Sequence, residues 1–310
     1  MKTAWQTTHK HTVNGKVTTA TGGHSHALSA VDEALAMLDA RMDDLAARLA
    51  ALETAPPPAE PPPEPPTSYP ASLQAAIDAA PAGGTINVTG GPVYRELITI
   101  SKPLTLVGAR IDGRVSASAY AIGIEIANTQ DVILRDCVVS DVRYAGIMVS
   151  DSLRVRIEDC RVYRVDAGRQ NANMNAYGIA VTDRGTRRSS DVMVLRAIVE
   201  DVPDWHGLDT HGGLRVQFLD CIVRRCNRAI FVTSSSLAPA AECEISRSLC
   251  SEPTPRRDVL TTPPYNEVGL TIVTGCSAHG DRNVFEGWPA GNAINVQSGA
   301  AGMFTGTVIR

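Results

Sequence analysis

The chain has 310 residues, of which 44% are hydrophobic and 20% charged, so most of it is expected to fold around a core. Its formal net charge of −4 argues against a nucleic-acid-binding protein, because such proteins usually present a basic face. The opening MKTAWQTTHKHT lacks the apolar run of a signal peptide, and no stretch of about 18 apolar residues follows. We therefore expect a soluble protein that does not insert into membranes.

Residues 1–26 carry four of the seven histidines as two His-x-His pairs in the stretch HKHTVNGKVTTATGGHSH. These are His9 with His11 and His24 with His26. Imidazole suits iron, zinc, copper and nickel, but two imidazoles are too few to close a metal site within one chain. The alternative is an exposed His-rich turn or a β-hairpin at Asn14-Gly15.

Residues 27–54 show apolar side chains at alternating steps of three and four, which is the heptad pattern of a coiled coil. The seam consists of Leu28, Val31, Leu35, Leu38, Met42, Leu45, Leu49 and Leu52. Because such a seam cannot be buried by one helix alone, it predicts an oligomer. Leucine at both seam positions does not choose between two and three strands.

Residues 55–67 contain the run PPPAEPPPEPP, which cannot form a helix or a sheet strand. It predicts an extended polyproline-II spacer that ends one domain and begins the next.

Residues 68–310 repeat a short strand, a turn, a second strand and another turn at intervals of about 23 residues. The units begin at Gly123, Gly146, Gly178, Gly207, Ala229 and Gly269. This pattern predicts a right-handed parallel β-helix of roughly eight to ten rungs. Two inward columns are expected, the first being Ile124, Ile147, Ile179, Leu208, Ile230 and Leu270, and the second Ile126, Val149, Val181, Thr210, Val232 and Ile272.

The seven cysteines include no CxxC pair, so neither a disulfide framework nor a zinc knuckle is indicated. Several of them fall at one position of the repeat, in a predicted interior column of Cys137, Cys160, Ala197, Cys221 and Ser248. We expect these thiols to be reduced and structural.

The beginning of this region, SLQAAIDAAPAGGTINVTGGPVYRELITISKPLTLVGA, resembles the opening of pectin-lyase-like β-helix domains. The resemblance implies a short capping helix near Ala75–Ala79, a turn at Gly83-Gly84, and first strands at Ile86–Val88 and Leu104–Gly108. It concerns the fold, which serves lyases, hydrolases and binding proteins alike.

One rung, DVPDWHGLDTHGG at residues 201–213, concentrates groups suited to acid–base chemistry. The predicted catalytic residues are Asp209, His211, His206 and Asp204. If Leu208 faces inward, strand alternation turns Asp209 and His211 outward. The predicted substrate-binding residues are Trp205, Tyr177, Tyr144 and Arg228, with the long segment AGRQNANMNA before Tyr177 as a wall.

The residues leave the reaction open. A glycoside hydrolase would need a second carboxylate, for which Asp183 and Asp204 are candidates, whereas a lyase would need a base and a cation. A zinc site from His206, Asp209 and His211 lacks an evident fourth ligand, and no catalytic cofactor is expected. The remaining alternative is that the Asp and His side chains only lie at turns and form hydrogen bonds with backbone groups there.

The order of a His-x-His head, a coiled coil, a stiff spacer and a terminal β-helix resembles bacteriophage tail fibres and tailspikes. That resemblance implies a homotrimer in which three chains give six imidazoles to one ion. One ion would be bound by His9 and His11 and another by His24 and His26, and the metal would be iron or another transition metal. The implied partners are other phage tail or virion proteins and a host cell-surface glycan.

The implied location is the virion tail, assembled in the host cytoplasm and extracellular after release. Three functions follow for testing: a tail fibre or tailspike whose β-helix binds and cleaves a host polysaccharide, a non-enzymatic structural or decoration protein of the virion, and a bacterial polysaccharide lyase or glycoside hydrolase.

Overall fold

The computed structural model describes residues 6–13, 16–23, 68–114, 120–167, 175–255, 267–289 and 291–310. The chain divides into two compact units, Met1–Glu64 and Pro65–Arg310, which are described separately. The predicted coiled coil of residues 27–54 and the spacer of residues 55–67 lie outside the described residues, as do His24 and His26.

The first unit contains an antiparallel pair of strands, β1 (Gln6–Val13) and β2 (Lys16–Gly23). Val13 pairs with Lys16 at one end of this ladder, and Gln6 pairs with Gly23 at the other. The predicted turn at Asn14-Gly15 itself lies outside the described residues. His9 and His11 both lie in β1, opposite Ala20 and Thr18.

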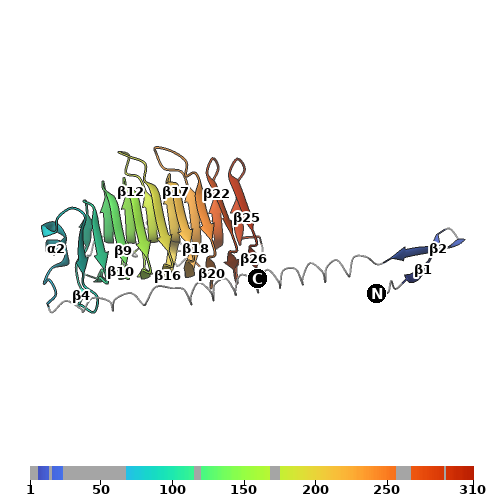
Figure 1. The fold of residues 1–310 in the computed structure, drawn as a ribbon, viewed down its shortest axis with the longest axis horizontal. Coiled ribbons are helices and arrows are strands. Elements are labelled where there is room, and N and C mark those ends of the chain that lie inside the picture. The colour runs from blue at the N-terminus through green and yellow to red at the C-terminus, as the bar shows by residue number, and fades with distance from the viewer. Residues whose placement is uncertain are drawn as a thin grey trace, which may run out of the picture. The chain divides into compact units, whose positions relative to one another are not determined.

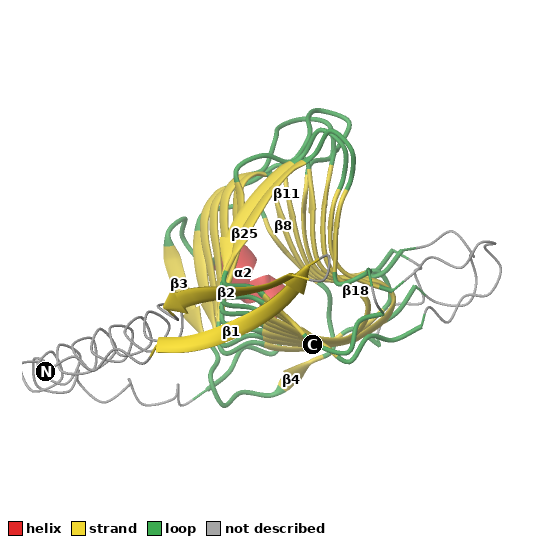
Figure 2. Ribbon diagram, turned by 90° about the vertical axis from the view of Figure 1, so that its right-hand side faces the viewer, coloured by secondary structure: helices red, strands yellow, loops and turns green. Residues whose placement is uncertain are grey.

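The second unit is a parallel β-helix in which successive rungs stack along one axis (Figure 1). Each complete rung contributes one strand to each of three faces, which are seen end-on in Figure 2. Face 1 contains β5 (Ile98–Ile100), β8 (Ile122–Ala127), β11 (Ala145–Ser150), β14 (Tyr177–Thr182), β21 (Val268–Ile272) and β24 (Ile294–Val296).

Face 2 contains β3 (Gly84–Asn87), β6 (Leu104–Val107), β9 (Gln130–Arg135), β12 (Leu153–Glu158), β15 (Ser190–Leu195), β17 (Leu214–Leu219), β19 (Cys243–Ser246), β22 (Ser277–Asp281) and β25 (Ala301–Thr305). Face 3 contains β4 (Val93–Tyr94), β7 (Arg110–Asp112), β10 (Val138–Val142), β13 (Arg161–Val165), β20 (Leu249–Ser251), β23 (Val284–Phe285) and β26 (Val308–Ile309). Two long strands, β16 (Ile198–His211) and β18 (Ile222–Thr233), belong to face 3 at their beginning and to face 1 at their end. The nine described strands of face 2 agree with the predicted eight to ten rungs.

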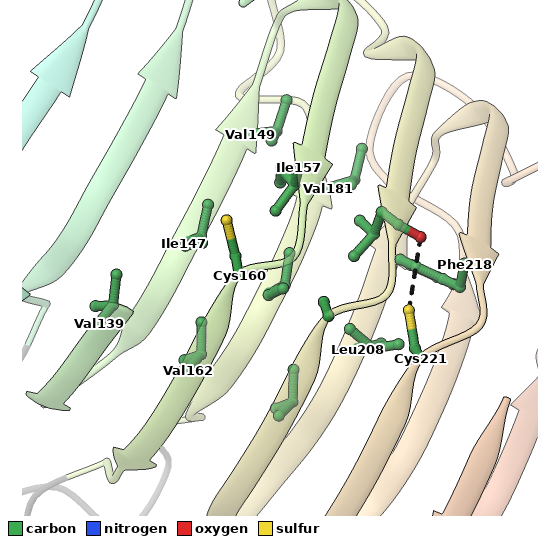
Figure 3. Close-up of a cluster of buried hydrophobic side chains, with 14 of the residues drawn as sticks. Val139, Ile147, Val149, Ile157, Cys160, Val162, Val181, Leu208, Phe218 and Cys221 are labelled. Atoms are coloured by element: carbon green, nitrogen blue, oxygen red, sulfur yellow. Dashed lines mark hydrogen bonds between the residues drawn. The ribbon is translucent and has the colours of Figure 1, made fainter. Parts of the chain in front are cut away.

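The interior of the β-helix is filled by the predicted columns. Strand pairing stacks Ile124, Ile147 and Ile179 on Leu208, and all four side chains are fully buried. The second column is confirmed as well, including Thr210, its polar member. Figure 3 shows part of this core, where aliphatic side chains from neighbouring rungs pack against one another.

A short helix, α2 (Leu73–Ala79), covers the first rungs with two buried apolar residues, Leu73 and Ile77. Ser72 caps this helix, because its hydroxyl oxygen accepts a hydrogen bond from the Ala75 amide at 3.1 Å. The helix confirms the resemblance-based expectation of a capping helix near Ala75–Ala79. In the described part of the chain, no helix combines the length and apolarity needed to cross a bilayer.

Three columns of residues at the corners between faces have positive φ, a conformation that non-glycine residues rarely adopt. The first column is Asp131, Arg154, Asp191, Arg215 and Glu242; the second is Asp136, Asp159, Arg196, Asp220, Arg247 and Arg282; the third is Asp141, Arg164, Asp201, Arg225 and Glu252. Along most of each column acidic and basic residues alternate, and neighbouring rungs form ion pairs such as Arg154 with Asp131 at 2.7 Å and Arg196 with Asp159 at 2.6 Å. The corner residues of one rung therefore form ion pairs with those of the next rung.

All seven cysteines are buried and unpaired as thiols. Cys137, Cys160 and Cys221 occupy the predicted interior column, because their neighbours Val138, Arg161, Ile198 and Ile222 pair in register. In Figure 3 Cys160 and Cys221 lie among the aliphatic side chains, and the Cys221 thiol donates to the Val194 carbonyl at 3.5 Å. Burial raises the pKa of Cys221 and Cys226 to about 12, which suppresses the reactive thiolate.

We therefore expect none of the seven thiols to react appreciably with dithionitrobenzoate in the native protein, and all seven to react after unfolding in guanidinium. Absorbance of the released thionitrobenzoate measures both numbers. Fast reaction of even one thiol in the native protein would contradict a purely structural role for that cysteine.

Candidate functional site

The predicted site lies at the end of β16, where this strand has bent from face 3 onto face 1. The pairing of β16 with β18 is irregular between Val202 and His206 and regular again from His206 to His211. Leu208 and Thr210 point into the core, so Asp209 and His211 lie on the outer side of face 1, as strand alternation predicted. Asp209 pairs with Ala180 and Phe231, the two neighbours expected from the repeat.

Asp209 lies between two imidazoles. The Nδ1 atom of His206 is hydrogen-bonded to one carboxylate oxygen of Asp209, and Nδ1 of His211 contacts the other oxygen at 2.5 Å. A carboxylate only accepts hydrogen bonds, so Nδ1 of His206 donates the proton in its bond to Asp209. The side chain of His211 is 31% exposed, whereas those of His206 and Asp209 are 1% and 0% exposed.

Although Asp209 lies on the outer side of the face, its side chain is buried. Its cover is aromatic: His206 stacks between Trp205, at 4.7 Å between ring centroids, and Phe231, at 4.1 Å. The Tyr177 ring contacts both His206 and His211 edge to face. Among the three groups, His211 is therefore the one that a dissolved molecule can reach.

The three groups shift one another's protonation. Burial raises the pKa of Asp209, but the charges and hydrogen bonds of His211 and His206 outweigh it and lower that pKa to about 2. Burial lowers the pKa of His206 to about 4 despite the attraction of Asp209. Burial also lowers the pKa of His211, but Asp209 outweighs it, so the pKa of His211 is raised above its usual value. At neutral pH Asp209 is thus an anion and His206 is neutral.

The two other carboxylates considered for this site have different surroundings. Asp204 is buried and accepts a hydrogen bond from the Ala167 amide at 2.9 Å, so it fixes the start of the segment before β14. Asp183, also buried, has no hydrogen-bond partner for either oxygen among the described residues, and its charge contributes to the raised pKa of His211. Asp183 is therefore the better candidate for a second acidic group beside His211.

The predicted substrate-binding residues surround this centre at different depths. The guanidinium of Arg228 lies 4.7 Å from the Trp205 ring and 5.2 Å from the Phe231 ring. Tyr144 is partly buried, but the side chain of Tyr177 is only 6% exposed, and its hydroxyl accepts a hydrogen bond from Asn175. Tyr177 is thus a packing residue, contrary to the expectation that it lines a groove. Most of the segment expected to wall that groove, residues 168–174, lies outside the described residues.

Sequence reasoning missed an ion pair on the same surface. Arg184 follows β14 and reaches back over two rungs, contacting the Met148 sulfur at 3.6 Å and the Glu125 carboxylate at 2.6 Å. Glu125, Met148 and Ala180 are consecutive members of the column that contains Asp209, which was a usable signal for their proximity.

No group of three or more His, Cys, Asp or Glu side chains is placed to hold a metal ion among the residues that the structure describes. His206 and His211 both direct Nδ1 at the same carboxylate, so a zinc site from His206, Asp209 and His211 is not formed. The His-x-His pairs near the N-terminus lie outside what this observation covers.

The fold agrees with a comparison to known protein families. The model of the right handed beta helix region matches residues 108–285, more than half of the chain, so the chain belongs to this family. Its fold is a right-handed parallel β-helix. No curated protein matches the sequence.

Several solved structures are similar to this chain. Pectate lyase Pel9A is 15% identical with a TM-score of 0.44, over 78% of this chain and 72% of that one. Alginate lyase from Paenibacillus sp. str. FPU-7 is 14% identical with a TM-score of 0.45, over 77% and 94% of the two chains. Pectin methylesterase from Aspergillus niger is 10% identical with a TM-score of 0.44, over 78% and 83%.

Proposed function

We propose that this chain is a homotrimeric phage tail fibre or tailspike protein whose β-helix binds and processes a host cell-surface polysaccharide. The observation that carries the proposal is the Asp209 carboxylate, fully buried between two imidazoles, of which His211 alone is partly exposed. A buried anion that orients one accessible imidazole is an arrangement suited to moving a proton.

His211 is the proton-transfer group in this proposal. Its Nδ1 is engaged by Asp209, which leaves Nε2 to meet the substrate. Asp209 stabilises the protonated form of His211, so the imidazolium can donate a proton to a leaving oxygen and the neutral ring can accept one. These two directions serve a hydrolase and a lyase respectively, and Asp183 supplies a second carboxylate in either case.

Sugar recognition is assigned to the groups around His211. Trp205 and Arg228, which stack on each other, offer an apolar ring and a fork of donors next to the reacting centre. Carbohydrates present both apolar C–H faces and hydroxyls, so this combination suits them better than it suits a purely apolar ligand.

The virion assignment rests on the N-terminal sequence. The heptads of residues 27–54 bring copies of the chain together, and three copies would supply six imidazoles to an ion at each His-x-His pair. His9, His11, His24 and His26 would hold iron or another transition metal in a structural role. The spacer of residues 55–67 would then separate this head from the β-helix.

Two measurements on the full chain test the proposal. Sedimentation equilibrium is expected to give three times the chain mass of 32.9 kDa, and a stable monomer would contradict it. An array of bacterial capsular, O-antigen and exopolysaccharide glycans is expected to retain the protein. Bound glycans are then assayed for unsaturated products, which indicate a lyase, and for new reducing ends, which indicate a hydrolase.

A non-enzymatic virion protein is the second candidate, favoured by the complete burial of Asp209 and His206. It predicts that glycan is bound but neither product is formed. A bacterial lyase or hydrolase would form product without any association with virions, which immunogold labelling of phage particles would separate from the first proposal.

A further inference from the structure

Face 1 carries an apolar cluster on its outer side, separate from the core of the β-helix. Its buried members are Ala145, Met148, Tyr177 and Ala180, with Ile122, Tyr144 and Trp205 packed against them. These apolar and aromatic side chains therefore pack together on the outer side of the face, where side chains usually meet solvent.

A row of aromatic rings runs through this cluster with one ring per rung. Tyr120 precedes β8, Tyr144 precedes β11, and Tyr177 begins β14. The ring centroids lie 5.4 Å apart between Tyr120 and Tyr144, 5.6 Å between Tyr144 and Tyr177, and 5.9 Å between Tyr177 and His211. The row therefore starts at His211 and continues towards the N-terminal rungs.

Exposure increases along the row. Tyr177, next to His211, is 6% exposed and Tyr144 is partly buried, but Tyr120, at the far end, is 64% exposed. With strands about 4.8 Å apart, Tyr120 lies three rungs and roughly 14 Å along the axis from His211. The row thus ends in a ring that presents most of its side chain to solvent.

Polar groups accompany the rings. The ion pair of Arg184 with Glu125 lies on the same face, on the rungs between Tyr120 and His211. The strands β8, β11 and β14 are paired on both sides, so their backbone offers no open edge to an extended peptide. A chain of sugar rings, whose faces are apolar and whose edges carry hydroxyls, fits this surface.

We propose that Tyr120 and Tyr144 form a remote sugar-binding subsite, so that the ligand is an oligosaccharide of at least four units lying along the helix axis. This inference rests on the proposed glycan binding at His211 and adds the direction and the minimum length of the ligand. Shorter fragments, which end before Tyr120, do not reach the subsite.

The test compares fragments of two to eight sugar units from a glycan that the wild-type protein retains on the bacterial glycan array. For fragments of four or more units, Tyr120→Ala is expected to raise the Kd about fivefold or more, while fragments of two units bind equally to both proteins. Tyr120→Phe keeps the ring and is expected to bind as the wild type does. Tyr163→Ala, which removes a tyrosine ring from face 3, is the matched control and leaves all Kd values unchanged.

The outcomes separate this inference from the proposed function. Equal Kd values for Tyr120→Ala and wild type on long fragments overturn the subsite while leaving glycan binding at His211 intact. A loss that is the same for short and long fragments also overturns it, because Tyr120 would then act through the fold. If the wild type retains no glycan on the array, the proposed function fails and this inference fails with it.

Discussion

Replacing His211 with alanine or asparagine is expected to reduce the rate of glycan cleavage by about 10²–10⁴-fold, the usual contribution of a positioned acid–base group. The two variants differ in whether they keep a hydrogen-bond donor for the Asp209 carboxylate. Asparagine keeps an N–H donor near the position of Nδ1, whereas alanine leaves the buried carboxylate with His206 as its remaining imidazole partner. We therefore expect His211→Ala to lower the free energy of unfolding by about 2 kcal/mol and His211→Asn by less than about 1 kcal/mol.

Initial rates of product formation and urea unfolding curves measure the two effects. The control is His279→Ala, which removes an exposed histidine from β22 on face 2 and is expected to change neither quantity. Wild-type cleavage rates in His211→Asn would rule out proton transfer by His211 and leave Asp183 as the acid–base candidate.

The second large effect is a loss of stability in mild acid caused by His206. Its folded-state pKa of about 4 lies below the value of about 6.5 in the unfolded chain, so the unfolded chain binds the proton first as the pH falls. The free energy of unfolding is therefore unaffected by protonation of His206 above pH 6.5, and it decreases progressively as the pH falls from 6.5 towards 4. The expected loss is about 3 kcal/mol, since His206 is fully buried.

The neighbouring groups act in other pH ranges. The pKa of Asp209, lowered to about 2, contributes stability that is present above about pH 3.9 and is lost below it. The raised pKa of His211 contributes stability below about pH 6.5 that is lost as the pH rises through its folded-state pKa. Among these three residues, His206 therefore accounts for most of the change in the free energy of unfolding between pH 4 and 6.5.

The variant His206→Asn isolates the effect of His206 protonation on stability, because asparagine keeps a hydrogen-bond donor to Asp209 but does not titrate. Urea unfolding at pH 4.5, 5.5 and 6.5 is expected to show a steeper decline for the wild type than for His206→Asn. An identical decline in both proteins would show that His206 is already protonated in the folded state. The exposed His279, replaced by asparagine, is expected to leave the wild-type decline unchanged.

The interior of the β-helix could be predicted because it depends on a period. Each rung places an aliphatic residue at the same step, so aligning the repeats put Ile147 on Ile124 and Cys160 on Cys137 without further information. The capping helix followed from the resemblance of its sequence to other β-helix openings. These features need only the alternation of strands and the stacking of like residues.

The site depends on side-chain contacts that do not follow from the sequence repeat. Alternation placed Asp209 on the outer side, but its burial requires Trp205 and Phe231 to close over His206 from two different rungs. The contact of Arg184 with Glu125 joins residues that are far apart in sequence, through a long side chain lying across Met148. Side-chain reach and ring packing, which fix both features, are not readable from hydrophobic spacing.

The corner residues with positive φ give the β-helix a larger unit than the rung. From Arg154 onward, successive rungs carry the corner charges plus-minus-plus, then minus-plus-minus, for four rungs. Removing either of the two inner rungs, those of Asp191 and Arg215, would set like charges against each other at all three corners, whereas removing both would leave every corner attractive. A single exposed ion pair contributes little, but three mismatches at one junction would act together. We therefore expect this segment to tolerate lengthening or shortening in steps of two rungs, because only such steps keep opposite charges in contact at every corner.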